Sequence, residues 1–290
     1  MHRKNFVAKT LTGLTEAVKR AVFAEHYARL PGLLQGLDPR GKILTFLALL
    51  IATAVTHRPE VLLGIYLLTI VLALASRIPL VFFTKRVWLF IPLFTGAIAL
   101  PAIFNFITPG RPVFTLVTLA APINWGPFHF PGEITITEQG LRGAAIFILR
   151  VAASVSLSVL LILTTEWARL LRALSALHFP RVGILILGMT YRYIFLFIKV
   201  AEEMFLARRS RIVGRTSTRE QQRWVSARLG FMLNKSYNLS NEVYLAMLSR
   251  GWNGQARFLD DFHFRWKDAA WVVFTFAFLF LIVFFTWIYK

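Results

Sequence analysis

The sequence predicts an all-α integral membrane protein with about five transmembrane helices and a basic helical module on the cytoplasmic side. Of its 290 residues, 57% are hydrophobic and 16% are charged, whereas a soluble domain averages about 25% charged residues. The charges are mostly basic, with 33 Lys and Arg against 14 Asp and Glu and a net charge of +19. The apolar residues gather in runs that approach the roughly 20 residues needed to cross a bilayer as a helix.

Five apolar segments are expected to cross the membrane, at residues 43–56, 61–75, 87–107, 143–165 and 269–289. The first two are separated only by residues 57–60, so we expect a tight helical hairpin. The third is interrupted by Pro92 and Pro101, and the fourth contains Arg150. The last ends in Trp287, Tyr289 and Lys290, a typical interfacial anchor.

The distribution of basic residues predicts the orientation. The first 42 residues carry 8 Lys and Arg, so the N-terminus is expected on the cytoplasmic side. The connector 76–86 holds three further basic residues and returns to that side, whereas residues 108–142 hold only two, which suits the outer side. The C-terminus then lies outside.

The apolar run 182–198 is ambiguous. If it crossed the membrane, residues 199–267 would lie outside, although they carry 13 Lys and Arg against six acidic residues. The positive-inside rule disfavours this arrangement. We therefore interpret residues 182–198 as the start of a long amphipathic helix that stays on the cytoplasmic side.

Three cytoplasmic helices are expected between the fourth and fifth spans. The first covers about residues 166–177, with Thr164 or Thr165 as its N-cap and Glu166 in its first turn. The second covers about 182–212. The third covers about 219–250 and is closed by Gly251 as the glycine after the C-cap.

An internal repeat marks the ends of the two longer helices. Residues Glu203–Arg211 align with Glu242–Arg250 at an offset of 39 residues, and both copies end in Ser-Arg. An arginine at a helix C-terminus stabilises the helix dipole by about 0.3–1 kcal/mol, which explains each copy alone. The repetition also fits two equivalent docking points, at which an arginine binds a partner's carboxylate.

Other singled-out residues have structural explanations. Asp38 and Pro39 read as a helix N-cap and the first helical residue, which would put Arg40 and Lys42 at the level of the lipid headgroups. Arg150 lies inside a span, where it either has a functional role or pairs within the bundle.

Several function classes lack support in the sequence. There is no cysteine, and the six histidines show no paired metal-ligand spacing. Nucleotide-binding glycine loops and hydrolase motifs are also missing. We therefore expect no cofactor, no metal site and no catalytic residue in this chain. Membrane orientation and anionic lipid explain the basic insert better than nucleic acid does, so no nucleic-acid partner is expected.

At the two Ser-Arg helix ends, the sequence resembles a known family. This family is the transmembrane T component of energy-coupling factor (ECF) transporters, and the resemblance is greatest to its cobalt/nickel-type CbiQ branch. The two short Ala-Arg-Gly signatures of that family correspond to Ser210-Arg211-Ile212 and Ser249-Arg250-Gly251; Ile212 departs from the pattern, and serine replaces alanine in both. Three further segments match in order, at residues 37–42, 137–140 and 163–165. The resemblance covers about residue 33 to the C-terminus.

The resemblance implies a scaffold without chemistry of its own, in a prokaryotic cell membrane. Two long, crossing coupling helices would bind a pair of ABC-type ATPases, identical or different, through the two signatures. The membrane domain would hold a substrate-binding S component, and Asp38, Pro39, Arg40 and Arg150 would be structural or contact that component. The cargo would be Co²⁺ or Ni²⁺, bound by the partner subunit.

This interpretation predicts four parts. They are a basic N-terminal cytoplasmic segment (residues 1–36), a membrane domain with four spans (37–165), a cytoplasmic coupling-helix module (166–267) and a final span (268–290). One alternative is a stand-alone secondary transporter, which needs inverted repeats and ionisable residues at the membrane midplane. Another is a T component that serves a vitamin-type S component.

Overall fold

A computed structural model describes Gly13 and residues 26–88, 91–105, 107–118, 123–125, 128–130, 133–212, 217–254 and 265–288. The chain forms two compact units. One, called here the bundle unit, combines residues 27–166 with 262–290; the other, the long-helix unit, combines residues 1–26 with 167–261. Of the predicted N-terminal segment 1–36, only Gly13 and residues 26–36 belong to the described part of the chain, and Lys290 lies outside it.

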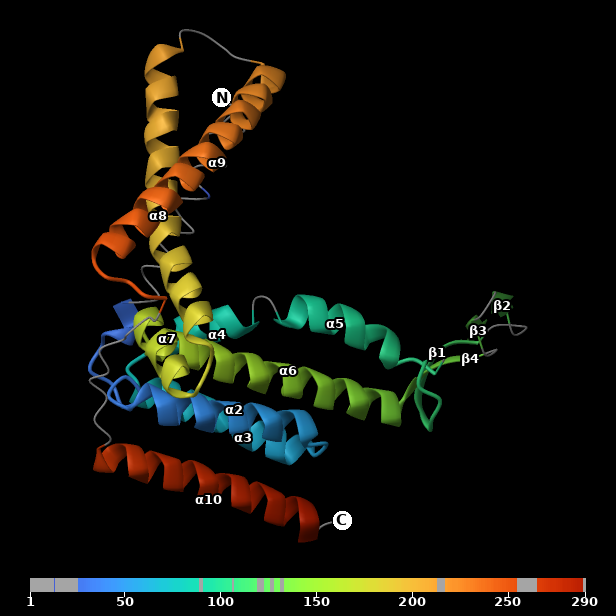
Figure 1. Cartoon of the computed structure of the whole chain (residues 1–290). Helices are drawn as coiled ribbons and strands as arrows, with labels where there is room; N and C mark the ends of the chain where they lie inside the picture. Colours follow the sequence, from blue (N-terminus) through green and yellow to red (C-terminus); the bar gives the residue numbers. More distant parts are fainter. Residues whose placement is uncertain are drawn as a thin grey trace. The chain divides into compact units, whose positions relative to one another are not determined.

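The bundle unit is built from six helices among the residues that the structure describes. These are α2 (Pro39–Val55), α3 (Pro59–Ala75), α4 (Leu80–Trp88), α5 (Ile91–Ala102), α6 (Glu138–Thr164) and α10 (Trp266–Ile288). Helices α2 and α3 lie beside α6, and α10 lies beside α2 (Figure 1). The core is formed where they meet, and its fully buried side chains include Phe46, Leu49, Leu62, Ile65, Leu157 and Leu160.

The start of α2 follows from its sequence. The Asp38 carboxylate accepts a hydrogen bond from the main-chain N–H of Arg40, and Pro39 occupies the first turn, where a missing N–H costs nothing. Both predictions for this pair are confirmed. The predicted short connection between the first two spans is also present, since α2 ends at Val55 and α3 begins at Pro59, and both helices pack on α6.

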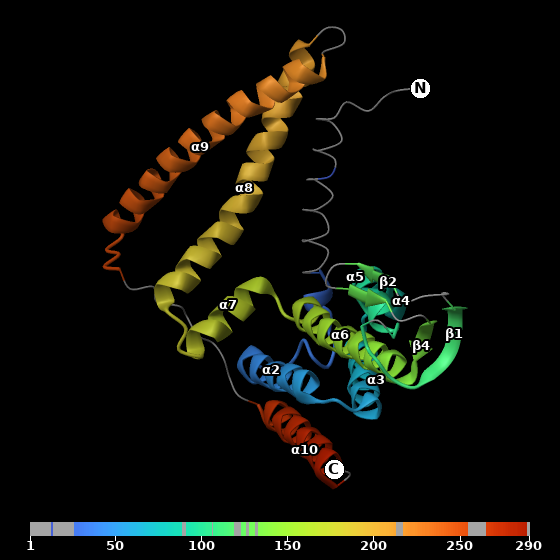
Figure 2. The same cartoon turned by 90° about the vertical axis from the view of Figure 1, so that its right-hand side faces the viewer.

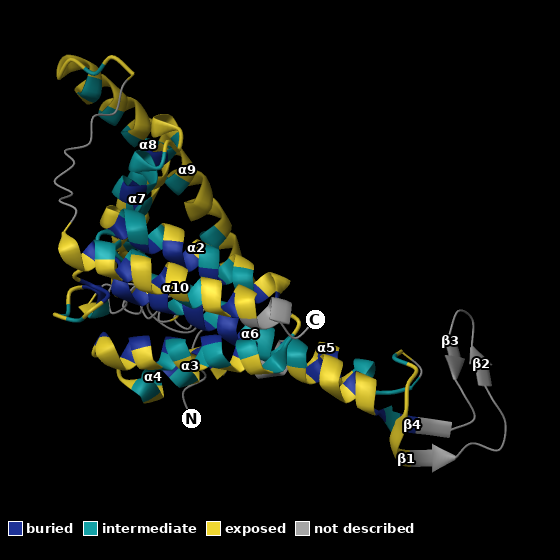
Figure 3. Ribbon diagram, turned by 90° about the horizontal axis from the view of Figure 1, so that it is seen from below, coloured by how far each residue is buried: buried dark blue, intermediate teal, exposed yellow. Residues whose placement is uncertain are grey.

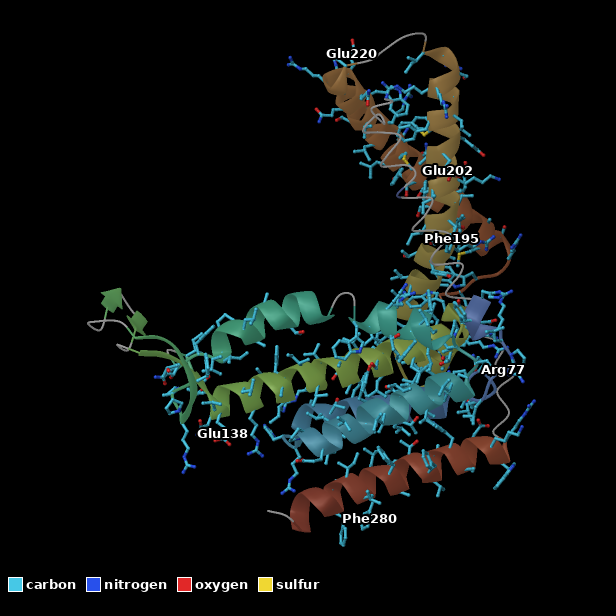
Figure 4. The ribbon with its side chains drawn as sticks, turned by 180° about the vertical axis from the view of Figure 1, so that it is seen from behind. Arg77, Glu138, Phe195, Glu202, Glu220 and Phe280 are labelled. Carbon is cyan, nitrogen blue, oxygen red and sulfur yellow. The ribbon has the colours of Figure 1, made fainter. Side chains whose placement is uncertain are left out.

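Buried and exposed residues alternate around these helices (Figure 3). Helix α10 packs on α2 through Trp271, whose indole N–H donates to the Thr45 hydroxyl at 2.9 Å. Its opposite side is apolar and exposed: Phe280, with 71% of its surface accessible, projects from the outer side of the helix (Figure 4). An apolar outer surface is what a helix facing lipid requires.

The third predicted span, residues 87–107, was expected to be interrupted by prolines. It contains the end of α4, at Trp88, and the short helix α5, which covers Ile91–Ala102; residues 89–90 lie outside the described part. Proline lacks a main-chain N–H and disrupts a helix interior, and α5 ends one residue after Pro101. The chain then turns, and Phe104 forms an isolated β-bridge with Ile136.

Four short strands occupy the segment predicted to lie outside. Strand β1 (Pro112–Thr118) pairs antiparallel with β4 (Glu133–Thr137), and β2 (Ile123–Trp125) pairs with β3 (Phe128–Phe130). The sequence analysis assigned no strands here. They are small additions to a helical architecture, and the predicted all-α class is confirmed.

Among the described residues, three helices are long and apolar enough to cross a membrane by length and composition: Glu138–Thr164, Arg181–Arg211 and Trp266–Phe284. Pro59–Ala75 is a shorter apolar helix. The first and third correspond to the predicted fourth and fifth spans. Arg181–Arg211 contains the ambiguous run 182–198, which the charge distribution predicts to lie on the cytoplasmic side.

The long-helix unit contains α7 (Trp167–Ala176), α8 (Arg181–Arg211) and α9 (Thr218–Ser249). Helices α8 and α9 approach each other at the connection between them and diverge toward their other ends (Figure 2). Helix α7 packs on α8, where Leu171 and Ile184 are buried and the Trp167 and Tyr191 rings lie 5.6 Å apart. The bounds of all three helices agree with the predicted ones to within two residues.

The predicted N-cap of α7 is wrong. Thr164 is the last residue of α6 and Thr165 is its C-cap, so both threonines belong to the end of α6. Helix α7 begins at Trp167, and Glu166 precedes it instead of lying in its first turn. The hydroxyl of Thr164 donates to the Leu160 carbonyl at 2.6 Å, a bond within α6 that the capping prediction did not consider.

A glycine at the start of α6 is required by close packing, and this generates a prediction. A methyl group at Gly140 would lie 2.7 Å from the Ala102 carbonyl oxygen and 2.8 Å from that of Ile103, which are main-chain atoms. A methyl group at Gly143, one turn later, would meet nothing within 4 Å. We expect Gly140→Ala to cost about 1–3 kcal/mol and to lower the thermal unfolding midpoint in detergent.

The matched control is Gly143→Ala, which should leave the midpoint unchanged or raise it slightly, because alanine is favoured over glycine by about 1 kcal/mol in a helix. Equal midpoints for the two variants would contradict the close approach of α5 and α6.

Candidate functional site

The two copies of the repeat end α8 and α9, as predicted. Arg211 is the last residue of α8, and Arg250 is the C-cap of α9; both side chains are exposed. The serines that precede them make matching hydrogen bonds within their helices: the Ser210 hydroxyl donates to the Ala207 carbonyl at 2.9 Å, and that of Ser249 to Ala246 at 3.0 Å. The local conformation of the two copies therefore agrees up to each arginine.

After the arginines the two ends differ. At the end of α9, Gly251 has a φ of +81°, in the left-handed region that glycine adopts without strain. Its N–H donates to the Leu248 carbonyl, and the N–H of Trp252 donates to that of Met247. These two bonds form a Schellman motif, as the predicted closing glycine implies. The Trp252 ring packs edge-on against Tyr244, with ring centroids 6.0 Å apart.

At the end of α8 the C-cap is Ile212, which is extended, with φ −91° and ψ 120°. Its N–H donates to the Arg208 carbonyl, and its φ is negative where the aligned Gly251 has a positive φ. A β-branched isoleucine cannot adopt the glycine conformation without strain. The isoleucine at position 212 thus retains the arginine before it but has a different local conformation from Gly251.

The two arginines lie at opposite ends of α9. Arg211 precedes its first turn by a short connection, and Arg250 follows its last residue. Because a helix rises 1.5 Å per residue, the 32 residues of α9 span about 48 Å. The structure thus does not bring the two signatures together into one site, but presents them as two separate exposed points.

An aromatic contact joins α8 and α9 near the first of these points. The Trp224 ring of α9 lies 4.9 Å from the ring of Phe205 on α8, and the guanidinium of Arg208 lies 4.4 Å from the Trp224 centroid. Arg228 lies over the same ring at 5.6 Å. A cation–π contact of this kind contributes about 0.5–1 kcal/mol at an exposed position. The contact holds the two helices together close to Arg211.

The start of α9 is capped by two reciprocal hydrogen bonds. The Ser217 hydroxyl accepts from the Glu220 N–H, and the Glu220 carboxylate accepts from the Ser217 N–H, which is a complete capping box. Glu220 marks this end of the helix, and Phe195 and Glu202 mark the course of α8 (Figure 4). Apart from Gln221, the described residues of α9 are exposed or half-buried, so most of the helix surface is available to a partner.

The membrane arginine has a structural partner. One terminal nitrogen of Arg150 donates to the carbonyl oxygen of Thr56 at 2.8 Å. Thr56 is the C-cap of α2, where unsatisfied carbonyls and the negative end of the helix dipole favour a cation. The sequence left two explanations for Arg150, a functional role or pairing within the bundle. This contact fits pairing within the bundle.

Lys42, which the sequence predicts at the level of the lipid headgroups, is buried inside the bundle unit, which the sequence did not predict. Lys42 is 1% exposed. Its ammonium donates to the carbonyl oxygen of Leu34 at 3.0 Å, to that of Thr164 at 2.9 Å and to the Thr165 hydroxyl at 2.8 Å. These three oxygens match the three ammonium donors. The bonds join two of the segments that resemble the family, residues 37–42 and 163–165.

A second buried polar contact involves Asp268, which the sequence analysis did not single out. Asp268 is 4% exposed. One carboxylate oxygen accepts from the main-chain N–H of Asp38 at 2.7 Å, and the other from that of Arg265 at 2.7 Å. The carboxylate thus caps α10 and binds the residue before α2. The only signal in the sequence for this capping role was that Asp268 is an acidic residue three positions after Arg265, a candidate helix start.

No metal centre is apparent in the described ranges, where no three His, Asp or Glu side chains gather in a way that could hold an ion. The features that do stand out are the exposed arginines at two helix ends and the buried polar contacts around α2.

The described helices define a multi-pass, all-α membrane protein. The family model of the cobalt transport proteins, CbiQ, matches residues 32–259, and the chain belongs to this family, a membrane component of ECF-type transporters.

Three individual relatives are similar to this chain, and one of them is named a cobalt transport protein. An uncharacterized protein of Methanocaldococcus jannaschii is 35% identical over 277 residues, which cover 96% of this chain and 91% of the relative. The cobalt transport protein CbiQ of Rhodobacter capsulatus is 28% identical over 129 residues, 44% of this chain and 52% of that protein. A second uncharacterized protein of M. jannaschii is 24% identical over 162 residues, 54% of this chain and 60% of the relative.

The Schellman motif at the end of α9 generates a prediction. Gly251→Ala places a side chain on a residue with positive φ, at a cost of about 1 kcal/mol. We expect the amides of residues 251 and 252 to exchange with solvent about five-fold faster, because their hydrogen bonds to Leu248 and Met247 open more often. Hydrogen-exchange mass spectrometry measures this directly.

Gly230→Ala is the control, since Gly230 lies inside α9 and an added methyl group would meet nothing within 4 Å. This variant should leave exchange at residues 251 and 252 unchanged. Unchanged exchange in Gly251→Ala as well would contradict the motif.

Proposed function

We propose that this protein is a T component that couples a pair of ABC-type ATPases to a membrane-embedded S component. The observation that carries the proposal is the repeated Ser-Arg end on two long helices, each with an exposed arginine. Membership of the CbiQ family supports it. The chain transmits movement and does not hydrolyse ATP itself.

The geometry of the two ends suits a partner with two similar subunits. Arg211 precedes the start of α9 and Arg250 follows its end, and α9 is about 48 Å long by its helical rise, so each arginine can contact a different ATPase. An arginine fork binds a carboxylate through two parallel hydrogen bonds. The matching serine bonds before each arginine support similar docking, while Ile212 and Gly251 give the two contacts different neighbours.

The cargo proposed is Co²⁺ or Ni²⁺. The family description names cobalt transport, and a relative in R. capsulatus is named a cobalt transport protein. The metal ligands would belong to the S component, since neither the sequence motifs nor the described side chains of this chain offer a ligand set.

Charge reversal at the helix ends tests the docking. Arg211→Glu and Arg250→Glu should each reduce co-purification of the ATPase pair with the tagged protein at least ten-fold, because truncating one partner of a buried charge pair costs about 2–5 kcal/mol and reversal adds repulsion. Membrane insertion and the elution profile of the protein alone should not change.

Lys235→Glu is the matched control, because Lys235 is an exposed cation on α9 away from both ends, and it should bind the ATPases normally. Retention of the ATPases by the double variant Arg211→Glu/Arg250→Glu, with ATP hydrolysis still coupled to uptake, would refute the proposal.

We also propose the orientation predicted from the charges, with the N-terminus and the long-helix unit in the cytoplasm. The chain has no cysteine, so a single introduced thiol reports its own side of the membrane. Ser240→Cys on α9 and Thr115→Cys in β1 replace exposed residues. In intact cells a membrane-impermeant maleimide should label position 115 and not position 240. Labelling of position 240 before lysis would show that α8 crosses the membrane.

A further inference from the structure

The part of the chain that carries both proposed docking points is attached to the bundle unit at two places. Residues 167–261 leave the bundle unit after Glu166 and return to it at Phe262. Movement of α8 and α9 can reach the bundle unit along these two covalent connections, and residues 26 and 27 form a further covalent link between the two units. The residues that hold the bundle-side end of each connection decide how firmly that movement is transmitted.

The first connection is held by Lys42. Its ammonium donates to the carbonyl of Thr164 and to the hydroxyl of Thr165, the last residue and the C-cap of α6. The negative end of the α6 dipole favours a cation at this position. Next to it, Glu166 forms an ion pair with Arg29 at 3.1 Å. The chain is thus fixed up to the residue before α7.

The second connection is held by Asp268. Its carboxylate accepts from the N–H of Arg265, the residue before α10, and from the N–H of Asp38, the residue before α2. A carboxylate that accepts charge-assisted bonds from two main-chain amides while 4% exposed is held firmly in position. The point where the chain re-enters the bundle unit is thereby tied to the start of α2.

Both contacts meet on one helical turn. Asp38 and Lys42 are four residues apart, and the N–H of Lys42 donates to the Asp38 carbonyl at 3.1 Å. The Asp38 side chain caps the same turn through Arg40. Five consecutive residues, 38–42, therefore bind both the exit at Thr164–Thr165 and the return at Arg265–Asp268, which lie 122 and 230 residues away in the sequence.

We propose that the first turn of α2, residues 38–42, is the anchor through which the bundle unit receives movement from the long-helix unit, and that Lys42 and Asp268 are positioning residues for transport. This inference rests on the proposed coupling function. A buried lysine is costly to desolvate, and an apolar residue would fill the same space without that cost. What lysine adds here is a directed link to the end of α6.

The test uses the complete complex with its ATPases and S component in proteoliposomes. Three quantities are measured for each variant: the amount of assembled complex, the rate of ATP hydrolysis, and the Co²⁺ uptake per ATP hydrolysed. The variants are Lys42→Met, which keeps the aliphatic stem but donates no hydrogen bond, and Asp268→Asn. Lys85→Met is the control, because Lys85 is an exposed lysine of the bundle unit.

The anchor predicts that assembly and ATP hydrolysis stay within two-fold of the wild-type values while uptake per ATP falls at least ten-fold in Lys42→Met and Asp268→Asn. Lys42→Arg should recover part of the loss, because a guanidinium can still donate to Thr164 and Thr165. Normal uptake per ATP in Lys42→Met complexes would overturn the inference. A fall in uptake that only parallels the amount of complex would also overturn it, since that is the signature of a purely structural role.

A second variant covers the case in which Lys42→Met does not fold. Thr165→Val removes one of the three acceptors at nearly constant volume, and should lower uptake per ATP by about three-fold or more. Normal coupling in this variant, with Lys42→Met unable to fold, would count against the anchor.

Hydrogen exchange on the purified chain separates this inference from the proposed function. Thr165→Val and Lys42→Met should accelerate exchange of the amides at residues 164–168 without accelerating those of α9. If the wild-type chain failed to bind ATPases, the proposed function would fail while this local result could still hold. If the ATPases bound but exchange at residues 164–168 did not change, the anchor alone would fail.

Discussion

The buried ammonium of Lys42 is the interaction on which much of the bundle depends. A lysine with 1% of its surface exposed is tolerated only where its donors are satisfied, and the three oxygens from Leu34, Thr164 and Thr165 satisfy them. Meeting this requirement fixes the loop before α2 and the end of α6 against the same turn. The Asp268 carboxylate then places the start of α10 on the other side of that turn. Helices that are far apart in the sequence are thus aligned at one common end.

The two repeated helix ends show how similar sequences acquire different surroundings. Up to each arginine the copies share their serine hydrogen bonds, because these depend only on residues within one helical turn. At the position after the arginine, Gly251 has a positive φ and closes a Schellman motif, whereas Ile212 has a negative φ in the extended region. The two proposed docking points therefore differ in their local conformation. The Trp224 contact with Phe205 and Arg208 joins α8 and α9 near Arg211.

Much of the fold and part of the candidate site could be predicted because the signals are local. Helix bounds in the long-helix unit, the Asp38 cap, the short connection between α2 and α3, the proline interruption of the run 87–107 and the closing glycine of α9 follow from patterns spanning at most a few turns. The N-cap prediction for α7 was wrong because two helices compete for the same residues. Thr165 could cap α7 or end α6; it is the C-cap of α6, and its hydroxyl accepts from Lys42.

The sequence by itself determined the membrane class, the family resemblance and the two Ser-Arg helix ends, since hydrophobicity, charge and short motifs are properties of consecutive residues. Only the tertiary structure decided where the polar residues of the bundle go. Lys42 looked like a headgroup cation and Asp268 like an ordinary first-turn acid, and nothing within a few residues of either indicates its partner. Their bonds span 122 and 230 residues, and burial of a charge depends on acceptors that are brought close only when the helices pack.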